Sequence, residues 1–455
     1  MKIKRIFVAN RGEIAVRIIR TCKEMGIETV VAVSEADKES MPARLADHVV
    51  CIGGPKPVDS YLRMDVMVHA AVHTKCDAVH PGYGFLSERA EFAELCERNG
   101  LLFIGPSPTN LKEMGDKIFA KDMARKCGIP VIPGSEGVVA FKDALKIAEQ
   151  IGFPVVLKAA GGGGGRGIRV VNTPDDIASS LHVARAEAGT AFEDQRVYVE
   201  KYLENVRHIE VQILADHWGN VVQLGERDCS IQRRYQKIIE EAPAPFLPER
   251  VRHDIRQAAL LLAKAIKYRS AGTVEFLYDR DTGLYYFMEM NTRIQVEHPV
   301  TEMVTGVDLV KEQIKIAAGL PLSFSASSIK IKGHAMECRI SAESPSHGFL
   351  PVPGLITRWV PPSGPGIRID THCFDGYYVP PYYDSLIAKL IVHGRDRGDA
   401  VNKMIAALDS FVVEGVPTTI PFLKLLISST EFANGDINTN WVEKVLHDSY
   451  REGEI

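Results

Sequence analysis

Polar and apolar residues alternate between Phe287 and His298, where the chain reads FMEMNTRIQVEH. Mostly apolar residues fill the gaps, and the polar set consists of Glu289, Asn291, Arg293, Gln295 and Glu297. An extended backbone turns successive side chains to opposite faces, so the pattern predicts a strand with carboxylate, amide and guanidinium groups along one side. Such a row suits a divalent metal at one end and a small oxyanion at the other. The solvated face of an edge strand is the alternative, but the lack of Lys in the row favours a functional role.

Hydrophobic periodicity near the N-terminus predicts a parallel α/β unit. A short apolar strand at residues 6–10 precedes a helix whose apolar positions recur at helical spacing from Ile14 to Met25, and residues 28–34 form the next strand. This order is typical of a parallel sheet. Gly12 stands alone at the first turn, so the G-x-G-x-x-G dinucleotide fingerprint is absent. The segments HPGYGFLSE (80–88) and LLFIGPSP (101–108) complete the unit.

The rest of the chain divides at turn-rich segments. We expect a first domain at residues 1–110, a helical connector at 111–131, a small domain at 132–203 and a larger mixed α/β part at 204–455. The small domain begins near PVIPGSEG (130–137), whose prolines and glycines indicate a hinge. We therefore expect the small domain to be mobile.

Composition and charge are those of a globular protein with a substantial core. The 455 residues are 45% hydrophobic and 25% charged, with a net charge of −4. Eight cysteines form no C-x-x-C pair and no zinc spacing, which indicates reduced thiols. The first residues contain too short an apolar run for a signal peptide, and no segment approaches the ~18 apolar residues of a membrane helix. These features predict a cytoplasmic protein that does not enter a membrane.

A glycine run lies inside FPVVLKAAGGGGGRGIRVV (153–171), between two apolar strands. The first strand delivers Lys158, and glycines fill positions 161–165. Glycine backbone N–H groups can approach phosphate oxygens closely, and the lysine adds a positive charge. The order strand, glycine loop, strand differs from a P-loop, and the pattern G-x-x-x-x-G-K-[ST] is absent. A flexible hairpin tip is the alternative, but the adjacent lysine favours a lid over phosphates.

Two later segments contain charged residues that suggest binding sites. ERDCSIQRRYQKIIEEAPAP (226–245) is rich in Arg and Lys. Its one aromatic residue, Tyr235, disfavours nucleic-acid binding and leaves a solvated face or an anion pocket. Glu275 lies in the apolar strand AGTVEFLY (271–278), where an unpaired carboxylate would be costly. Together with Glu289 and Asn291 it makes a plausible magnesium site, because Mg²⁺ prefers oxygen ligands.

Taken in order, these segments resemble the biotin carboxylase component of biotin-dependent carboxylases, a branch of the ATP-grasp superfamily. The resemblance covers essentially the whole chain and rests on FVANRGEIAVRI, HPGYGFLSE, MGDKIFAK, LKAAGGGGGRG, EKYLENVRHIEVQ, ERDCSIQRRYQK, GTVEFL, EMNTRIQVEHPVTE, HAMECRI and VPPYYDSLIAKL. It implies an α/β ATP-grasp fold with an N-terminal Rossmann-like parallel-sheet domain, a small mobile lid domain and a C-terminal mixed α/β domain. The lid would be residues 132–203, and residues 204–455 would combine the rest of the ATP-grasp unit with the biotin carboxylase C-terminal domain.

The resemblance also implies roles for individual residues. ATP would be held by Lys117, Lys158, Gly164, Gly165, Glu200, Lys201, Leu203, His208, Gln232 and Tyr235. Magnesium or manganese, with two ions expected, would be bound by Glu275, Glu289 and Asn291. Bicarbonate would be held by Lys237, Arg293, Gln295 and Val296. Glu297 would remove the bicarbonate proton, and Arg339 would stabilise the biotin enolate, so that catalysis would rest on Lys237, Arg293, Glu297 and Arg339.

Biotin itself would come from a partner protein. The motif that carries biotin, a lysine flanked by methionines, is missing from the chain, and so is a domain that would transfer the carboxyl group. We therefore expect a separate subunit that works with a biotin carboxyl carrier protein and a carboxyltransferase. By resemblance it would be a homodimer with Arg20 and Glu24 near the contact. Acetyl-CoA is the expected final acceptor, with propionyl-CoA and pyruvate as alternatives.

One residue departs from the family pattern, and two other functions fit parts of it. Tyr235 stands where many members of the family have His, which affects the expected nucleotide contacts rather than the reaction. Another ATP-grasp ligase would activate an acid for attack by an amine, a route that needs no base for bicarbonate. A silent subunit that only binds nucleotide is disfavoured by the intact set of Lys237, Glu289, Arg293, Glu297 and Arg339.

Overall fold

The N-terminal part of the molecule is a five-stranded parallel sheet. The computed structural model describes residues 2–161, 168–192 and 194–452. The sheet has the order β3-β2-β1-β4-β5 and consists of β1 (Arg5–Val8), β2 (Glu28–Val33), β3 (His48–Cys51), β4 (Ala78–His80) and β5 (Leu102–Phe103). Its helices are α1 (Gly12–Glu24), α2 (Met41–Leu45), α3 (Met64–His73) and α4 (Ala90–Arg98). Ile6 and Val8 pack into one apolar cluster and Phe7 into another, as expected for a sheet covered on both faces. The predicted parallel α/β unit is confirmed.

The largest sheet has eight antiparallel strands and extends across the C-terminal half of the chain. Its order is β13-β12-β9-β10-β11-β14-β21-β19. The strands are β9 (Val206–Ala215), β10 (Val221–Arg233), β11 (Gln236–Ala242), β12 (Ser270–Asp279), β13 (Tyr285–Asn291), β14 (His334–Ser341), β19 (Ile367–Thr371) and β21 (Leu386–Gly394). Because β11 pairs with β14, strands from residues 206–291 and from residues 334–394 share one continuous sheet.

Helices cover this sheet at several places. They are α9 (Glu249–Ala265) on β9 and β10, α10 (His298–Thr305) on β14 and β21, α11 (Leu309–Ala317) on β12, and α12 (Arg397–Ser410) on β21. The C-terminal region adds α13 (Ile420–Ile427), α14 (Thr430–Asn434) and α15 (Trp441–Glu452). It also holds three short ladders, β15 (Glu343–Ser344) with β16 (Leu350–Pro351), β17 (Gly354–Leu355) with β20 (Tyr378–Val379), and β18 (Arg358–Val360) with β22 (Val412–Glu414).

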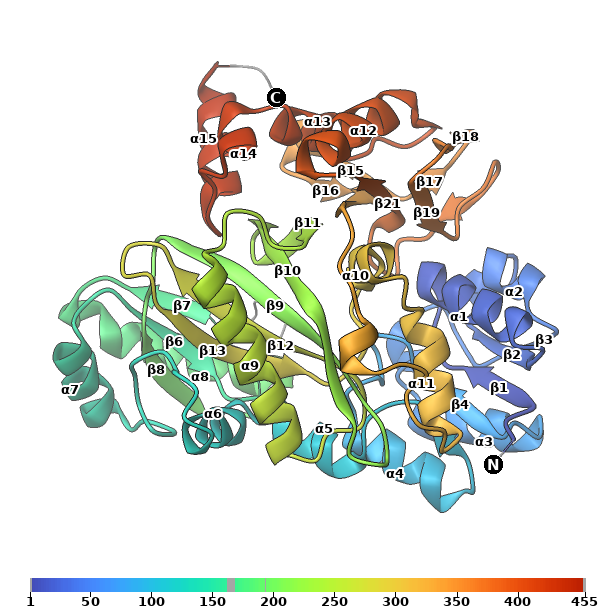
Figure 1. Ribbon diagram of the computed structural model, residues 1–455, viewed down its shortest axis with the longest axis horizontal. Helices are drawn as coiled ribbons and strands as arrows, with labels where there is room; N and C mark the ends of the chain where they lie inside the picture. Colours follow the sequence, from blue (N-terminus) through green and yellow to red (C-terminus); the bar gives the residue numbers. More distant parts are fainter. Residues whose placement is uncertain (1, 162–167, 193, 453–455) are drawn as a thin grey trace.

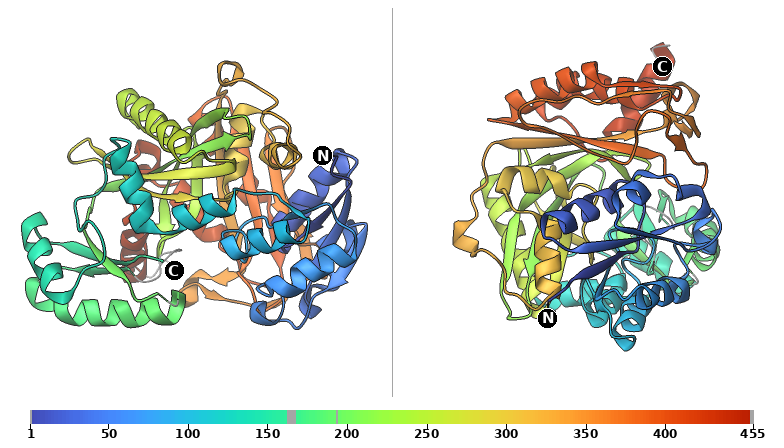
Figure 2. Two further views of the ribbon diagram at one scale, coloured as in Figure 1. Left: turned by 90° about the horizontal axis from the view of Figure 1, so that it is seen from below. Right: turned by 90° about the vertical axis from the view of Figure 1, so that its right-hand side faces the viewer.

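A third, three-stranded sheet contains the hairpin that the glycine run predicted. Its order is β7-β6-β8, with β6 (Val155–Ala159), β7 (Ile168–Val171) and β8 (Val197–Lys201), and α7 (Phe141–Ile151) and α8 (Ile177–Phe192) pack against it. Gly164 and Gly165, to which the sequence assigns phosphate binding, lie outside the described residues. Helices α5 (Pro108–Gly115) and α6 (Lys117–Lys126) lead from the N-terminal sheet to this one. The two sheets lie on opposite sides of the eight-stranded sheet (Figures 1 and 2).

The sequence prediction for residues 287–298 is partly wrong. Strand β13 ends at Asn291, which is the last residue paired with β12, and α10 begins at His298. The chain leaves the sheet because the backbone N–H of Thr292 donates to a carboxylate oxygen of Glu88 (3.1 Å) instead of continuing the ladder. Residues 292–297 therefore form a turn segment, and the alternation beyond Asn291 does not reflect a strand.

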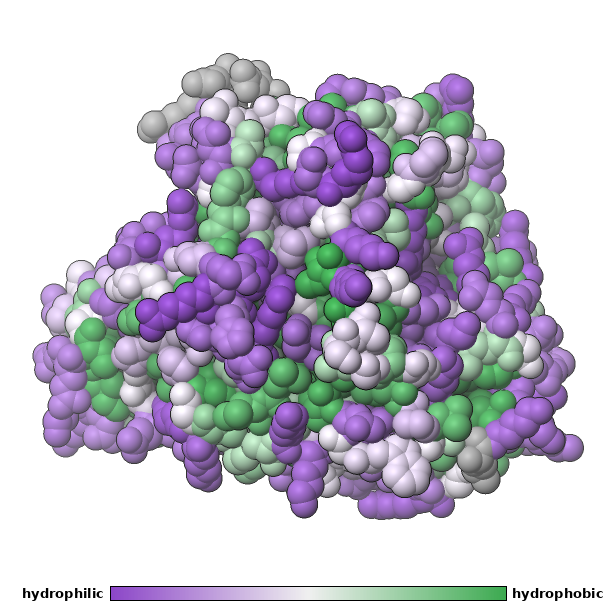
Figure 3. Space-filling view, viewed as in Figure 1, coloured by the Kyte–Doolittle hydropathy of each residue, from purple (hydrophilic) through white to green (hydrophobic). Residues whose placement is uncertain are grey.

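Figure 3 shows how hydrophilic and hydrophobic residues are distributed on one face of the molecule. The face in Figure 3 is largely hydrophilic at its margins, with hydrophobic residues gathered in a band across its lower middle. Among the described residues, every helix is too short or too polar to cross a bilayer.

Candidate active site

One cavity of about 770 Å³ gathers most of the residues that the sequence singled out. Its walls come from the small sheet, the eight-stranded sheet, the turn before α10 and the N-terminal end of α1. The predicted residues that line it are Lys117, Lys158, Lys201, Leu203, His208, Gln232, Tyr235, Lys237, Glu275, Glu289, Asn291, Arg293, Gln295, Val296, Glu297 and Arg339. Side chains from Lys117 to Arg339, more than two hundred residues apart in the sequence, thus line the same cavity.

The two predicted metal-binding carboxylates are held side by side by strand register. Glu275 on β12 pairs directly with Glu289 on β13, and Thr273 pairs with Asn291. Residues that are directly opposite on neighbouring strands project to the same face, about 5 Å apart. The side-chain amide nitrogen of Asn291 is buried without a hydrogen-bond partner. Two carboxylates and an amide oxygen form a donor set that suits Mg²⁺ or Mn²⁺.

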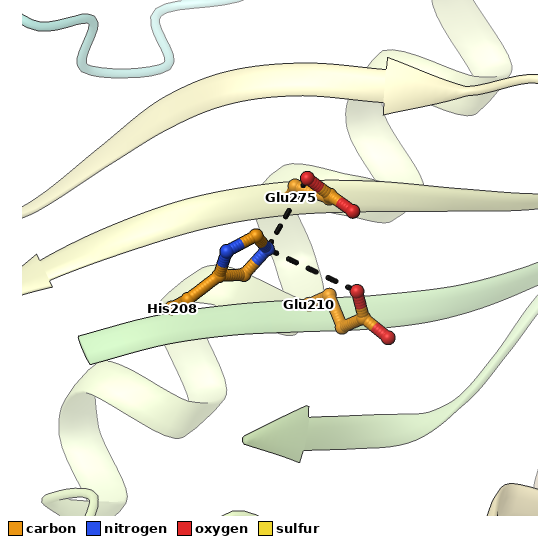
Figure 4. Close-up of side chains that lie close together, drawn as sticks. All are labelled: His208, Glu210 and Glu275. Atoms are coloured by element: carbon orange, nitrogen blue, oxygen red, sulfur yellow. Dashed lines mark ion pairs between the residues drawn. The ribbon is translucent and has the colours of Figure 1, made fainter. Parts of the chain in front are cut away.

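Glu210, which the sequence analysis did not assign, belongs to the same cluster. Figure 4 shows His208 directed toward the carboxylates of Glu210 and Glu275, and its Nε2 lies 3.9 Å and 3.1 Å from their nearest oxygens. The three side chains are buried, and their ligand atoms lie close enough to share a metal ion. Lys237 pairs with both carboxylates, so a metal ion bound by Glu275 would share that carboxylate with the lysine. Alternation along β9, with His208, Glu210 and Gln212 on one face, was the signal that could have revealed Glu210.

Lys237 is the centre of the charge cluster. Its Nζ lies 2.6 Å from Glu210, 2.9 Å from Glu275 and 2.7 Å from Glu297. Burial alone would lower the pKa of this lysine, but the three carboxylates raise it well above the ordinary value. The side chain is therefore an ammonium ion with its donors directed at three acids from three different segments.

Glu297 remains ionised although only 2% of its side chain is exposed. Burial raises the pKa of its carboxyl, but Lys237, Arg339 and Arg227 together hold it well below the usual range. Its second oxygen accepts from Nη2 of Arg339 at 3.0 Å. Arg339 also contacts Glu240 at 2.6 Å. The carboxylate is therefore ionised, which a general base must be before it can take a proton.

Two hydrogen-bonding residues outside the predicted set orient the turn before α10. Arg227 is fully buried and donates to the side-chain oxygen of Gln295 at 2.8 Å, while its Nε contacts Glu210. Gln295 in turn donates to Glu275 at 2.8 Å. Glu88, from the N-terminal segment HPGYGFLSE, accepts from Nε of Arg293 at 2.8 Å. The N-terminal part of the chain therefore fixes a residue of the predicted bicarbonate site.

The predicted phosphate lysines lie on different units of the fold. Lys158, on β6 of the small sheet, pairs with Glu200 on β8 at 2.9 Å. Lys117, at the start of α6, pairs with Glu289 on β13 at 2.8 Å. Burial and the nearby Lys117 lower the pKa of Lys158 to about 8. A polyanion between the two lysines would relieve this repulsion.

The segment predicted to hold a nucleotide base lines the cavity with Lys201 and Leu203. The carboxylate of Glu200 is occupied by Lys158 and Lys121, and it does not line the cavity. Lys201 donates its Nζ to the backbone carbonyls of Gly152 and Phe153, both at 3.0 Å. Leu203 lines the cavity with an apolar surface.

Tyr235 lies at the tip of the hairpin between β10 and β11. The two loop residues, Arg234 and Tyr235, both have positive φ, +48° and +65°. Two-residue hairpin loops of this kind usually carry Asn and Gly, so an Arg–Tyr pair is strained there. Tyr235 is half exposed, and its ring lies at the cavity wall beside Gln236. Gln232 is buried and lies 2.9 Å from Nδ1 of His208.

Comparisons with known proteins agree with this arrangement. Residues 2–111 match the biotin carboxylase N-terminal domain, residues 116–325 the carbamoyl-phosphate synthase L chain ATP-binding domain, and residues 337–444 the biotin carboxylase C-terminal domain. Biotin carboxylase 1 of Bacillus subtilis is 51% identical over 442 residues, which cover 97% of this chain and 98% of that protein.

Two solved structures have nearly the same fold. A biotin carboxylase complex with a β,γ-ATP ligand from Campylobacter jejuni is 48% identical, with a TM-score of 0.95 over 97% of this chain and 99% of the other. The biotin carboxylase domain dimer of Hydrogenobacter thermophilus 2-oxoglutarate carboxylase, in complex with MgADP, ADP and bicarbonate, is 47% identical, with a TM-score of 0.95 over 98% of both chains. The identities and the near-complete coverage show that this chain belongs to the biotin carboxylase family.

Proposed function

We propose that this protein is an ATP-dependent ligase that carboxylates biotin with bicarbonate by way of carboxyphosphate. The observation that carries the proposal is the cluster of Lys237, Glu297 and Arg339, in which a buried carboxylate stays ionised between two cations. A base of this kind beside an anion site fits the removal of the bicarbonate proton. Membership of the family and the ligands named for the two solved relatives support the same reaction.

The nucleotide and its metal would occupy the part of the cavity near the small sheet. Lys117 and Lys158 would contact the phosphates, and Glu200, Lys201 and Leu203 would hold the adenine edge largely through backbone groups. Glu275, Glu289 and Asn291 would hold two Mg²⁺ or Mn²⁺ ions, which supply charge neutralisation for the transferred phosphoryl group. His208, Gln232 and Tyr235 would contact the ribose side, and Gly164 and Gly165 would cover the phosphates.

Bicarbonate would lie against the turn before α10. The side chains of Lys237, Arg293 and Gln295 would bind its oxygens, whereas Val296 has no polar side-chain atom and would contribute backbone. Glu297 would take the proton, which makes the anion a better nucleophile toward the γ-phosphate. Removing a proton from a bound anion is favourable only where cations balance the added charge, and Lys237 provides that balance.

Arg339 would then serve the second step. Carboxyphosphate would release carbon dioxide and phosphate, the phosphate would take the proton from the biotin ureido nitrogen, and that nitrogen would then attack the carbon dioxide to form carboxybiotin. The negative charge that develops on the ureido oxygen would be stabilised by the guanidinium of Arg339, which already faces the cavity. Arg339 would therefore contact both the base of the first step, through its hydrogen bond from Nη2 to Glu297, and the biotin of the second step.

A steady-state assay tests this function. Purified protein with ATP, magnesium and bicarbonate should carboxylate free biotin weakly and a biotinylated carrier protein much faster. The diagnostic result is ATP cleavage that depends on bicarbonate and is stimulated by biotin. ATP cleavage that requires an amine instead, or nucleotide binding with no cleavage under any of these conditions, would overturn the proposal.

The biotin carrier and the carboxyltransferase would be partner proteins. The match to 98% of Biotin carboxylase 1 of Bacillus subtilis supports a biotin carboxylase role for this chain, with the other two activities on partners. Acetyl-CoA is our proposed acceptor and the cytoplasm our proposed location, with propionyl-CoA and pyruvate as alternative acceptors. Affinity capture with a tagged chain in its own cells, followed by mass spectrometry, would identify the carboxyltransferase and hence the acceptor.

We also propose a homodimer and a mobile lid. Arg20 and Glu24 are both exposed on α1, which leaves them accessible to a second copy. Light scattering at micromolar concentration should give twice the monomer mass, and a monomer would refute this. Residues 132–203 should close over ATP, which would appear as a smaller radius of gyration in X-ray scattering when a non-hydrolysable ATP analogue is added.

A further inference from the structure

Lys389 is a lysine in the interior of the eight-stranded sheet. It lies on β21, between β14 and β19, and its side chain is 0% exposed. Taking an ammonium group out of water is costly unless hydrogen bonds and opposite charges replace the water. Lys389 does not line the cavity, and the predicted reaction makes no use of it. Its presence in an otherwise apolar strand, LIAKLIV, therefore needs an explanation.

The partners of Lys389 come from three other segments. Its Nζ donates to the backbone carbonyl of Val296 at 2.9 Å, lies 3.0 Å from Glu13 on α1 and 3.7 Å from Asp370 on β19. Glu13 also accepts the hydroxyl hydrogen bond of Tyr83, which lines the cavity. Burial lowers the pKa of Lys389, but the surrounding carboxylates more than offset it and the net shift is upward. The donor to Val296 is therefore a charged one.

Strand register places Lys389 next to Arg339. The two residues are directly opposite each other in the antiparallel pair of β14 and β21. Arg339 contacts the side chain of Glu297, and Lys389 contacts the carbonyl of the residue before it. The two adjacent cations thus contact the same short turn. Arg339 contacts the carboxylate of Glu297, and Lys389 contacts the backbone carbonyl of Val296.

We propose that Lys389 is a positioning residue for bicarbonate binding and activation, which fixes the peptide between Val296 and Glu297 so that both residues face the bound anion. This inference rests on the function proposed above. The turn is the segment that leaves β13 at Asn291, and it has no ladder hydrogen bonds to hold it. A charge-assisted hydrogen bond from a rigid strand supplies that restraint. Glu13 keeps the ammonium group balanced, so the N-terminal domain also takes part in shaping the turn.

A purely architectural role for Lys389 is the competing explanation, because the ion pair with Glu13 also fastens α1 to the sheet. Lys389→Met removes the charge and leaves Glu13 buried without its partner, which will lower the melting temperature in either case. The double variant Lys389→Met/Glu13→Gln removes both charges, and Gln can still accept from Tyr83. This pair of variants separates stability from positioning.

The test measures melting temperature and the KM values for bicarbonate and ATP. In Lys389→Met we expect the bicarbonate KM to rise about tenfold to a hundredfold, the effect of losing one charge-assisted hydrogen bond, with the ATP KM within about twofold of wild type. In the double variant the melting temperature should recover, while the bicarbonate KM stays high. If the single variant does not fold, the double variant alone decides the question.

Lys403→Met is the matched control. Lys403, on α12, also donates to a backbone carbonyl, that of His393 near the end of β21, at 3.0 Å. Its loss should leave the bicarbonate KM unchanged. The inference is overturned if the double variant restores the bicarbonate KM together with stability, or if Lys389→Met raises both KM values equally. A wild-type protein without bicarbonate-dependent ATP cleavage would instead overturn the proposed function, and this inference with it.

Discussion

The bicarbonate side and the nucleotide side of the cavity are built differently. On the bicarbonate side, Lys237, Glu297 and Arg339 come from one sheet and the turn beside it, and every one contacts another. On the nucleotide side, Lys158 and Glu200 form a pair inside the small sheet, while Lys117 and Glu289 form a separate pair in the main body. The first group is already assembled, whereas the second is divided between two units.

This difference indicates which side of the cavity is ready for the reaction and which side a substrate must bring together. Charge that is fixed before the reaction costs no reorganisation when the transition state forms, so the acid–base chemistry belongs on the rigid side. The divided side gains most from a ligand that bridges it, because the phosphates of ATP would join two lysines that now repel each other. Four substitutions test whether the two sides of the cavity act independently.

Glu297→Gln should have the largest effect. It keeps the shape of the side chain but removes the base, and we expect turnover to fall by roughly a hundred- to ten-thousand-fold. ATP affinity should change little, since the nucleotide side is a separate group of charges. Kinetics of biotin carboxylation together with ATP titration would show this, and a near wild-type rate would remove Glu297 from the mechanism.

Arg339→Ala should slow biotin carboxylation by about a hundredfold and bicarbonate-dependent ATP cleavage by a smaller factor. The unequal loss follows from the proposed role of Arg339 toward biotin, which is separate from its hydrogen bond to Glu297. Parallel assays of ADP release and carboxybiotin formation measure both. Equal losses would mean that Arg339 acts only through Glu297.

Lys158→Met should raise the KM for ATP about tenfold and leave the KM for bicarbonate near its wild-type value. The lysine is one of the two cations proposed to contact phosphate, and a charged hydrogen bond of this kind contributes on the order of 1.5–3 kcal/mol. Lys126→Met, at an exposed lysine at the end of α6, is a suitable control. A change in both KM values would show that the two sides are not independent.

The smallest effect should appear in the pH dependence of ATP binding. Because the pKa of Lys158 is lowered to about 8, the group is an ammonium ion at pH 7 and loses its proton as the pH rises through 8. ATP affinity of the wild type should therefore decline severalfold between pH 7 and pH 9. Lys158→Arg keeps its charge over this range and should give a flat profile in calorimetry. The same decline in both proteins would assign the titration to another group.

Most of the residues that the sequence analysis singled out line the cavity, but the sequence did not reveal why they meet. Glu289 and Asn291 were found by a strand pattern that the structure confirms, whereas Arg293, Gln295 and Glu297 followed the same alternation but lie in a turn. Nothing in the local pattern distinguishes a strand from an irregular segment that leaves the sheet. The deciding contact is Thr292 with Glu88, some two hundred residues earlier.

The residues that sequence analysis missed are mainly the partners of the predicted ones. Arg227 was seen only as part of a basic segment, because its contacts with Glu210 and Gln295 depend on the folded sheet. Lys389 was detectable, since a single charge within an apolar strand is the same signal that singled out Glu275. The positions of Gly164 and Gly165 remain predictions, as do the ligand contacts of the whole set.

The pairing of β11 with β14 has a consequence for how the protein is made. The parallel sheet needs only residues 5–103 and the small sheet only residues 155–201, so each can form while the ribosome is still extending the chain. The eight-stranded sheet cannot close until β21, ending at Gly394, has emerged. The cluster of Lys237, Glu297 and Arg339 is therefore completed late in synthesis, and a chain truncated before β14 would keep Lys237, Glu297 and the proposed nucleotide lysines but lack Arg339.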